Sequence, residues 1–158
     1  MTLKTKILED IKICKMERKH LEQVVEIEKQ FFSEAWTVQN YINEISKPSS
    51  YLVVACIGEN VIGHVGMYTV FSEGYILNIA VREGYHNLGI GKMLMEEMLA
   101  YSLENELEFI TLEVRKSNIN AINFYKKLEF DITGERKDFY KYPTEDAYIM
   151  TGYLKTKE

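Results

Sequence analysis

The sequence of 158 residues has little of what several protein classes require. It contains only two prolines and nine glycines with no low-complexity run, which excludes collagen-like, mucin-like and largely disordered chains. Its longest nearly apolar stretch, 51–57, is far shorter than the roughly 20 residues of a membrane-spanning helix, and residues 1–10 lack the apolar core of a signal peptide. We therefore expect a cytoplasmic protein that has no membrane partner.

The spacings typical of metal sites are also missing. Cys14 and Cys56 stand apart in apolar stretches and form no Cys-x-x-Cys pair. The histidines, His20, His64 and His86, are scattered without His-x-x-x-His spacing. The sequence therefore predicts two reduced cysteines in the core and no metal ion.

The chain has no excess of basic residues. Lysine and arginine number 19 and aspartate and glutamate 24, so the formal net charge is -5. A negative chain is repelled by nucleic acid and by anionic membranes, and it attracts basic partners. We therefore expect no direct nucleic-acid binding.

Apolar residues, in contrast, are plentiful and regularly spaced. They make up 46% of the chain, enough for one compact domain, 1–158, with a real core. Alternating or β-branched runs predict strands at 11–15, 51–57, 61–70, 75–81, 109–114, 130–136 and 147–154. Helical spacing predicts a helix from Leu21, one from Val38 that is capped by Thr37 and ends at Lys47-Pro48, one at 92–105 and one at 119–127 capped at 117–118.

Helices interspersed among hairpins and strands are typical of a layered α/β (α+β) domain. Helical crossovers join parallel strands, whereas tight turns join antiparallel ones. The pattern therefore predicts a mixed, mostly antiparallel sheet of about seven strands with about four flanking helices.

A glycine-containing loop, 84–91, leads from strand 75–81 into the helix at Lys92. A helix N-terminus leaves backbone N–H groups unpaired, and such a loop lets phosphate oxygens approach them. It is not a Walker loop, because Met93 stands where a hydroxyl would hold magnesium, and it lacks the third glycine of a dinucleotide fingerprint at Leu94. By itself, the loop is equally compatible with a simple tight turn.

This region resembles a known family. Ile79-Ala80-Val81 followed by the segment 84–92 is similar to the acetyl-CoA motif Gln/Arg-x-x-Gly-x-Gly/Ala of the GNAT N-acetyltransferases. His86 occupies the first motif position, and Asn87 replaces a common basic residue. Backbone amides should therefore carry more of the phosphate binding.

Two later segments extend the resemblance, which spans roughly residues 36 to 150 in the right order. Residues 111–130 resemble the Leu-Glu-Val-Arg-x-Ser-Asn … Ala-x-x-x-Tyr-x-x-x-Gly-Phe signature of the GNAT branch that acetylates the N-terminal alanine of ribosomal proteins. Glu129 stands where glycine is usual. The segment 136–150 continues the likeness, with Asp138-Phe139 in place of Asn-Tyr.

The resemblance implies the GNAT fold and a direct transfer of acetyl from acetyl-CoA, without an acyl-enzyme. It assigns Glu113 as the general base and Tyr125 as the general acid. Read without the resemblance, Glu113 is a solvated strand residue and Tyr125 a core aromatic. The cofactor contacts that it implies are Ile79, Ala80, Val81, His86, Asn87, Leu88, Gly89, Ile90, Gly91, Lys92 and Asn118.

For the acceptor, the resemblance places Trp36 and Tyr140 beside the substrate groove. Four acids could give this groove a negative potential suited to a basic protein N-terminus, such as that of a ribosomal protein: Glu34, Glu44, Glu145 and Asp146. Alternatively, Trp36 only anchors the helix that Thr37 caps, and the acids form a solvated surface.

Two other functions stay open at this point. A GNAT enzyme that acetylates a small-molecule amine or a lysine side chain would need the same cofactor site. A non-catalytic module that binds acyl-CoA is the alternative from another class. A covalent mechanism has no support, because no base is placed beside either cysteine in the sequence.

Overall fold

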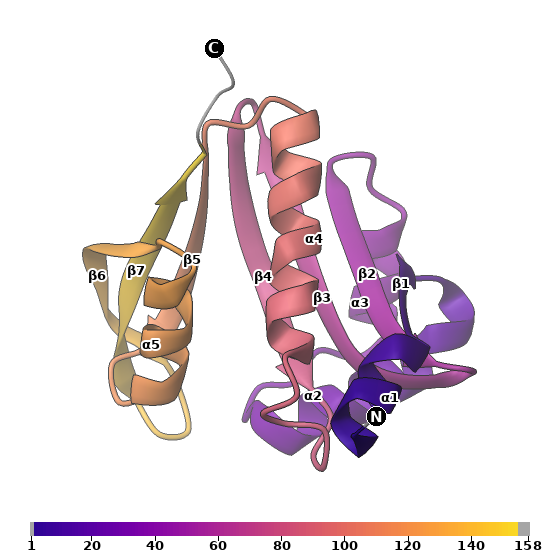
Figure 1. Cartoon of the computed structure of the whole chain (residues 1–158). Coiled ribbons are helices and arrows are strands. Elements are labelled where there is room, and N and C mark those ends of the chain that lie inside the picture. Colours follow the sequence, from indigo (N-terminus) through magenta and orange to yellow (C-terminus); the bar gives the residue numbers. More distant parts are fainter. Residues whose placement is uncertain (1, 155–158) are drawn as a thin grey trace. The chain divides into compact units, whose positions relative to one another are not determined.

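A computed structural model describes residues 2–154 of the chain (Figure 1). Its α-helices are α1 Leu3–Asp10, α2 Leu21–Phe31, α3 Val38–Ile45, α4 Ile90–Glu104 and α5 Ile119–Lys127, with a 3₁₀ turn, η1, at Arg18–His20. Its strands are β1 Ile11–Lys15, β2 Ser50–Ile57, β3 Asn60–Val70, β4 Glu73–Val81, β5 Phe109–Arg115, β6 Asp131–Tyr140 and β7 Glu145–Tyr153. The strands form one sheet in the order β1-β2-β3-β4-β5-β7-β6.

The described residues pack as two compact units. The first unit contains the residues up to Tyr68 together with Leu77–Met98. The second unit contains Thr69–Ile76 and the residues from Leu99 onward.

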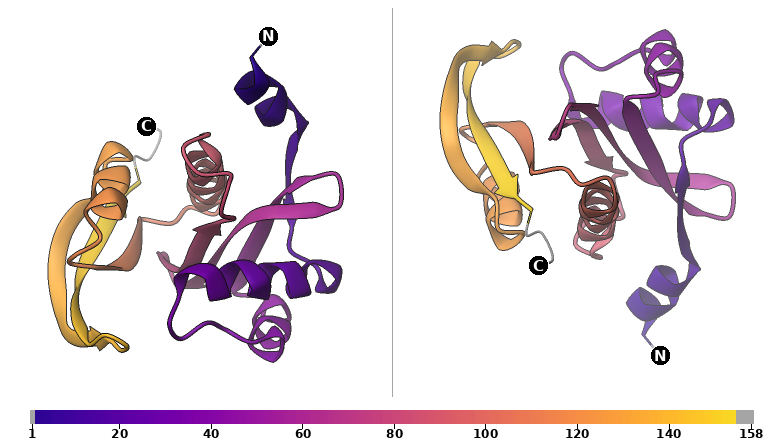
Figure 2. Two further views of the ribbon diagram at one scale, coloured as in Figure 1. Left: turned by 90° about the horizontal axis from the view of Figure 1, so that it is seen from below. Right: turned by 90° about the horizontal axis from the view of Figure 1, so that it is seen from above.

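The first unit is a three-layer arrangement. Strands β1 and β2 pair antiparallel, as do β2 and β3, which are joined at Gly58 with a φ of 58°. Helices α2 and α3 cover one face of these strands, and the first part of α4 covers the other (Figure 2). Helix α4 approaches β3 closely, because a Cβ at Gly63 would lie 3.2 Å from a methyl carbon of Leu94. A side chain at this position would fit only if Leu94 moved slightly away.

The second unit contains strands β5, β6 and β7 and the first part of β4. Three residue pairs, from Glu73↔Phe109 to Tyr75↔Thr111, join β4 to β5 in parallel. Strand β7 pairs antiparallel with both β5 and β6. The Phe130 ring fills the space over Gly152, where a Cβ would lie only 2.9 Å from the ring carbons.

The predicted architecture is confirmed, with one correction. The seven strands, the mixed sheet and the caps at Thr37 and Asn118 agree with the sequence analysis. The described residues hold five α-helices instead of about four, because α1 was not predicted. Helix α1 has no buried residue and only three apolar ones, Leu3, Ile7 and Leu8, which are too few to show a helical period.

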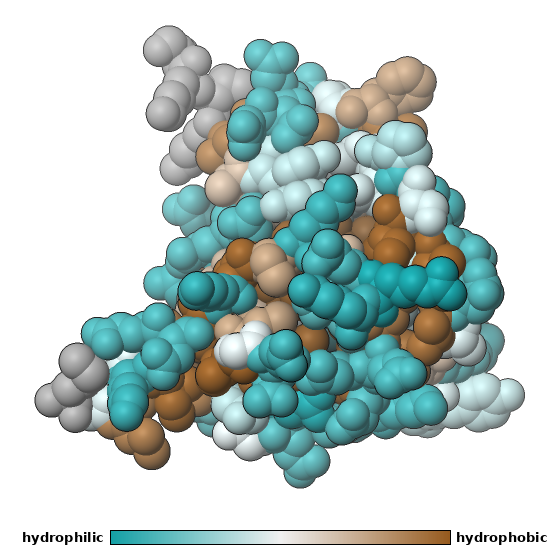
Figure 3. Space-filling view, turned by 90° about the vertical axis from the view of Figure 1, so that its right-hand side faces the viewer, coloured by the Kyte–Doolittle hydropathy of each residue, from teal (hydrophilic) through white to brown (hydrophobic). Residues whose placement is uncertain are grey.

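Hydrophilic side chains predominate on the face seen in Figure 3, with smaller apolar areas between them. Within residues 2–154, no helix is both long enough and apolar enough to pass through a bilayer.

Candidate active site

The loop before α4 has the geometry of an anion-binding turn. Gly84, Asn87 and Gly89 all have positive φ, of 93°, 62° and 86°. The helix starts at Ile90, earlier than the predicted start at Lys92, and the first helical bond runs from Met93 N to Gly89 O at 3.0 Å. The amides of residues 90–92 precede that bond and therefore have no carbonyl partner within the helix. Such amides, at the positive end of the helix dipole, suit a phosphate group.

The two departures from the acetyl-CoA motif both have structural reasons. The Nε2 of His86 donates to the Val81 carbonyl at 2.7 Å, and its ring lies 5.3 Å from that of Phe31. His86 thus ties the loop to the end of β4. Asn87 adopts a left-handed conformation, which asparagine tolerates better than most residues.

The predicted base, Glu113, lies on β5 between two buried residues. Leu112 and Val114 point into the core, whereas the Glu113 side chain on the other face is 24% exposed, as predicted. Its Oε1 lies 3.2 Å from the Nε of Arg136 on β6. This ion pair gives the carboxylate a defined orientation in the second unit.

The structure brings Glu113, Tyr140 and Tyr125 into one electrostatic neighbourhood of the second unit. Burial, and then the negative charge of Glu113, raise the pKa of Tyr140 to about 12. Burial, and then the charge of Tyr140, also raise the pKa of Tyr125. Both phenols therefore keep their protons at neutral pH, as a general acid must.

Two further contacts define the surroundings of these tyrosines. The Arg115 guanidinium lies 4.5 Å from the centre of the Tyr140 ring. The Tyr125 ring packs against those of Phe124 and Phe130, with centroids 5.1 and 5.9 Å away. Tyr125 is therefore a core aromatic, and its hydroxyl interacts electrostatically with that of Tyr140.

Asn118 is the N-cap of α5, as predicted. Its side chain accepts a hydrogen bond from Ala121 N at 3.1 Å, and the residue is exposed. The cap function leaves the side chain accessible to a ligand.

In the first unit, Trp36 is half-buried against the apolar core. Its ring lies 5.0 Å from that of Tyr41, and its backbone N–H donates to Glu28 Oε2 at 3.4 Å. Trp36 also lines a hollow of about 290 Å³ with Glu44, Lys47, Ser49, Tyr68 and Leu77. We call this hollow the Trp36 pocket.

The acids expected to make the groove negative are mostly paired with cations. Glu44 lies 3.0 Å from Lys47 Nζ, Glu145 3.2 Å from Arg115, and Asp146 3.7 Å from Lys116. Glu34 is exposed. Pairing balances much of the charge on which the sequence prediction depended.

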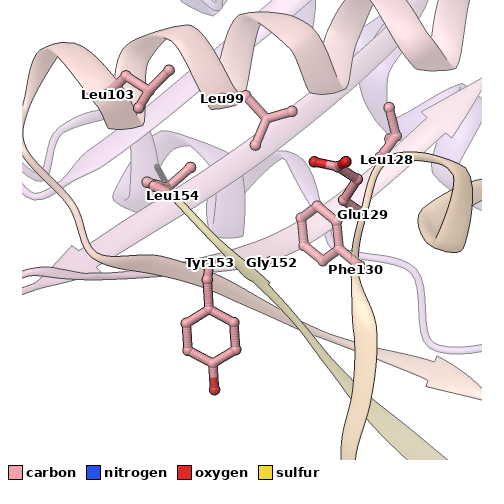
Figure 4. A pocket seen from close by; sticks show the side chains of 8 residues that line it. All are labelled: Leu99, Leu103, Leu128, Glu129, Phe130, Gly152, Tyr153 and Leu154. Carbon is pink, nitrogen blue, oxygen red and sulfur yellow. The ribbon is translucent and has the colours of Figure 1, made fainter. Parts of the chain in front are cut away.

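A second hollow, of about 190 Å³, lies in the second unit (Figure 4). It is lined by Leu99, Leu103, Leu128, Glu129, Phe130, Gly152, Tyr153 and Leu154. The Tyr153 ring points away from the leucines. No residue that the sequence analysis assigned to catalysis or binding lines it.

The cysteines differ from their prediction. Cys56 is buried, but Cys14 is exposed, and the register of β1 and β2 brings both sulfurs and a ring nitrogen of His20 within 4.8 Å of one another. His20 Nδ1 accepts a hydrogen bond from Glu17 N at 2.9 Å, so Nε2 carries the proton of the neutral ring. A metal ion needs a free nitrogen lone pair, so this arrangement fits one poorly.

Sequence reasoning missed a buried polar group around Glu28. Glu28 accepts hydrogen bonds from Tyr41 and from Asn78, and His64 is beside it. The four residues come from α2, α3, β3 and β4. The only signal in the sequence was a glutamate at an apolar position of the helical pattern from Leu21.

Comparisons with known proteins agree with this picture. Residues 21–130 match the acetyltransferase (GNAT) family. The chain is 32% identical over 152 residues to the ribosomal protein bS18-alanine N-acetyltransferase of Haemophilus influenzae, covering 94% of this chain and 99% of that one. It is 28% identical over 148 residues to the N-alpha-acetyltransferase RimI of Mycobacterium tuberculosis, covering 90% and 92%.

The crystal structure of the ribosomal-protein-S18-alanine N-acetyltransferase from Escherichia coli has the same fold. It superposes with a TM-score of 0.86 at 23% identity and covers 94% of this chain and 96% of that one. The family match covers more than half of the chain, and the loop before α4 lies within it. This chain therefore belongs to the acetyltransferase (GNAT) family and is an acyltransferase.

Proposed function

We propose that the protein transfers the acetyl group of acetyl-CoA to the α-amino group of a protein N-terminus, that of an alanine-starting ribosomal protein. The proposal is carried by a group of three residues: Glu113, whose carboxylate lies 3.2 Å from Arg136 on β6, Tyr140, whose pKa the Glu113 charge raises, and Tyr125, whose pKa the Tyr140 charge raises. This group supplies a carboxylate and protonated phenols, which are the groups that acyl transfer to an amine requires. The relative from Haemophilus influenzae, matched over nearly the whole chain, supports the choice of acceptor.

For acetyl-CoA, the donor set of the first unit suits a diphosphate. The amides of residues 88–92 would hold the phosphate oxygens, with His86 and Asn87 fixing the loop. Residues 79–81 would pair with the amides of pantetheine, since the ladder between β4 and β5 does not include them. Asn118 would contribute its exposed side chain.

The chemistry begins with a proton transfer. An α-amino group has a pKa of roughly 7.7–8.0, so most of it is protonated and unreactive at pH 7. Glu113 accepts the proton, directly or through a water, and the free amine attacks the thioester carbonyl. As the C–N bond forms and the C–S bond breaks, the nitrogen loses its second proton to solvent and Tyr125 donates a proton to the leaving thiolate. Glu113 then releases its proton to solvent, and Tyr125 takes one up from it. Trp36 and Tyr140 contact the acceptor.

The test is mass spectrometry of an alanine-starting peptide incubated with the protein and acetyl-CoA. We expect one added acetyl group at the α-amine. Glu113→Gln and Tyr125→Phe should each lower kcat/KM by about 10²–10⁴-fold without changing the affinity for acetyl-CoA. Glu108→Gln, an exposed glutamate next to β5, is the matched control and should behave like the wild type.

Parallel reactions with spermidine, an aminoglycoside and a lysine-containing peptide with a blocked N-terminus test the other acceptors. Turnover of one of these without turnover of the alanine peptide would reject the proposed acceptor. Full activity of Glu113→Gln would reject the proposed base.

A further inference from the structure

Behind Trp36 lies a buried carboxylate that the proposed chemistry does not use. Glu28 is fully buried in α2. The Tyr41 hydroxyl donates to its Oε1, whereas Trp36 N and Asn78 Nδ2 each donate to Oε2 at 3.4 Å. All of these partners are donors, which is the pattern that an ionised carboxylate requires.

The surroundings show why these bonds are needed. Burial raises the pKa of Glu28, and the hydrogen bonds from Tyr41, Trp36 and Asn78 oppose that shift. His64 Nε2 lies 3.5 Å from Oε1, but burial lowers the pKa of His64 to about 3, so the ring is neutral at pH 7 and supplies no charge. The donors from α3, β4 and Trp36 therefore stabilise Glu28 without a cation.

Glu28, Tyr41 and Trp36 each contact the other two. Glu28 holds the main chain of Trp36 through its N–H, and it holds Tyr41, whose ring lies 5.0 Å from the Trp36 ring. One carboxylate thus fixes both the backbone and the side chain of the tryptophan. Because the indole lines the Trp36 pocket with Tyr68 and Leu77, its position sets the shape of that pocket.

We propose that Glu28 is a positioning residue for the acceptor: it holds Trp36 at the Trp36 pocket and so sets the affinity for the first residues of the acceptor peptide. The inference rests on the proposed function. Glu28 does not touch the acceptor and transfers no proton, because its fully buried carboxylate is already occupied by three donors.

The chain offers a direct probe, since Trp36 is its single tryptophan. Intrinsic emission and acrylamide quenching therefore report on Trp36 in the free protein, independently of turnover. Steady-state kinetics with an alanine-starting peptide then report on the acceptor. A loss of stability alone would not raise the KM for peptide selectively. A positioning role would raise the KM for peptide and leave the KM for acetyl-CoA unchanged.

The variants are Glu28→Leu, which removes every acceptor oxygen, and Glu28→Gln, whose amide oxygen can still accept from Trp36 N. Tyr41→Phe keeps the ring and removes only the hydroxyl, so it serves if Glu28→Leu does not fold. Glu22→Gln, an exposed glutamate on the same helix, is the control.

We expect Glu28→Leu and Tyr41→Phe to increase quenching of Trp36 and to raise the KM for peptide about tenfold, with kcat and the KM for acetyl-CoA within about twofold of the wild type. Glu28→Gln should keep most of the peptide affinity that Glu28→Leu loses. Unchanged quenching and unchanged KM for peptide in folded Tyr41→Phe would overturn the inference while leaving the proposed function intact. A wild type that acetylates no peptide would overturn the proposed function and, with it, this acceptor role.

Discussion

At the residue scale, Glu129 follows the C-terminal end of α5 with a φ of 67°. Its N–H donates to Lys126 O at 3.0 Å, and Phe130 N donates to Tyr125 O at the same distance. The chain thus reverses through a left-handed residue, the conformation that glycine adopts without cost. This explains physically why glycine is usual at this position in the signature that the sequence resembles.

Glu129→Gly should therefore stabilise the protein. A non-glycine residue in the left-handed region costs about 1–2 kcal/mol, and the added backbone freedom of glycine in the unfolded chain offsets about 0.5–1 kcal/mol of that gain. We expect the free energy of unfolding, measured by urea denaturation, to rise by about 0.5–1 kcal/mol.

The matched control is Lys126→Gly, an exposed position inside α5 with helical geometry, where glycine should cost about 1 kcal/mol. A loss of stability in both variants would contradict the strain assigned to Glu129.

At the scale of elements, strand β3 carries a histidine into the centre of the first unit. His64 is fully buried, and neither ring nitrogen has a hydrogen-bond partner among the described residues. The tightly packed surroundings lower the pKa of His64 to about 3. His64, on a strand that is covered by helices on both faces, therefore resists protonation.

This arrangement predicts a loss of stability in acid. Unfolded His64 takes up a proton near pH 6.5 and the folded residue only near pH 3, so between these values the unfolded state binds more protons. Stability should fall as the pH drops through that window, by up to about 1.4 kcal/mol per pH unit from this residue. Glu28 has the opposite effect on stability. Burial raises its pKa, so the folded state takes up this proton before the unfolded state does as the pH drops.

Urea denaturation at pH 7 and pH 5 measures this effect. Relative to the wild type, His64→Leu should lose about 2 kcal/mol less between the two pH values. Parallel pH dependences of the two proteins would show that His64 does not titrate as its burial requires.

At the scale of the whole molecule, the net charge of -5 does not favour phosphate binding, so a phosphate has to be bound by groups in the loop before α4. The chain as a whole repels a negatively charged nucleotide, and Asn87 brings no positive charge to the loop. The remaining attraction comes from the helix dipole and the free amides at the start of α4, together with Lys92, whose charge is shared with Glu96 at 3.7 Å.

Acetyl-CoA should therefore stabilise the protein through its diphosphate. At 100 times its Kd it should raise the free energy of unfolding by about 2.7 kcal/mol, measured as a shift in Tm. Adenosine at the same concentration, which lacks phosphate, should produce almost no shift. Equal shifts from the two compounds would place the binding energy elsewhere than at the amides of residues 88–92.

Much of the fold could be predicted from the sequence because it depends on local patterns. Apolar periodicity predicted the strands and four of the helices. The residue types at Thr37 and Asn118 predicted the helix caps. Alternation along β5 predicted on which face of the strand the Glu113 side chain lies. Helix α1 was not predicted, because none of its residues is buried. The pairing of the acids with cations was not predicted either, because the register of the strands decides which charged side chains come close together.

The sequence by itself determined the order of the elements, the loop before α4 and the family, since each depends on residues that are close together in the chain. Only the tertiary structure decided that Cys14 meets Cys56, that Glu113 shares its surroundings with Tyr140, and that Glu28 holds Trp36. The physical reason is that a buried polar group needs partners from several elements, and packing in three dimensions determines which ones come within reach.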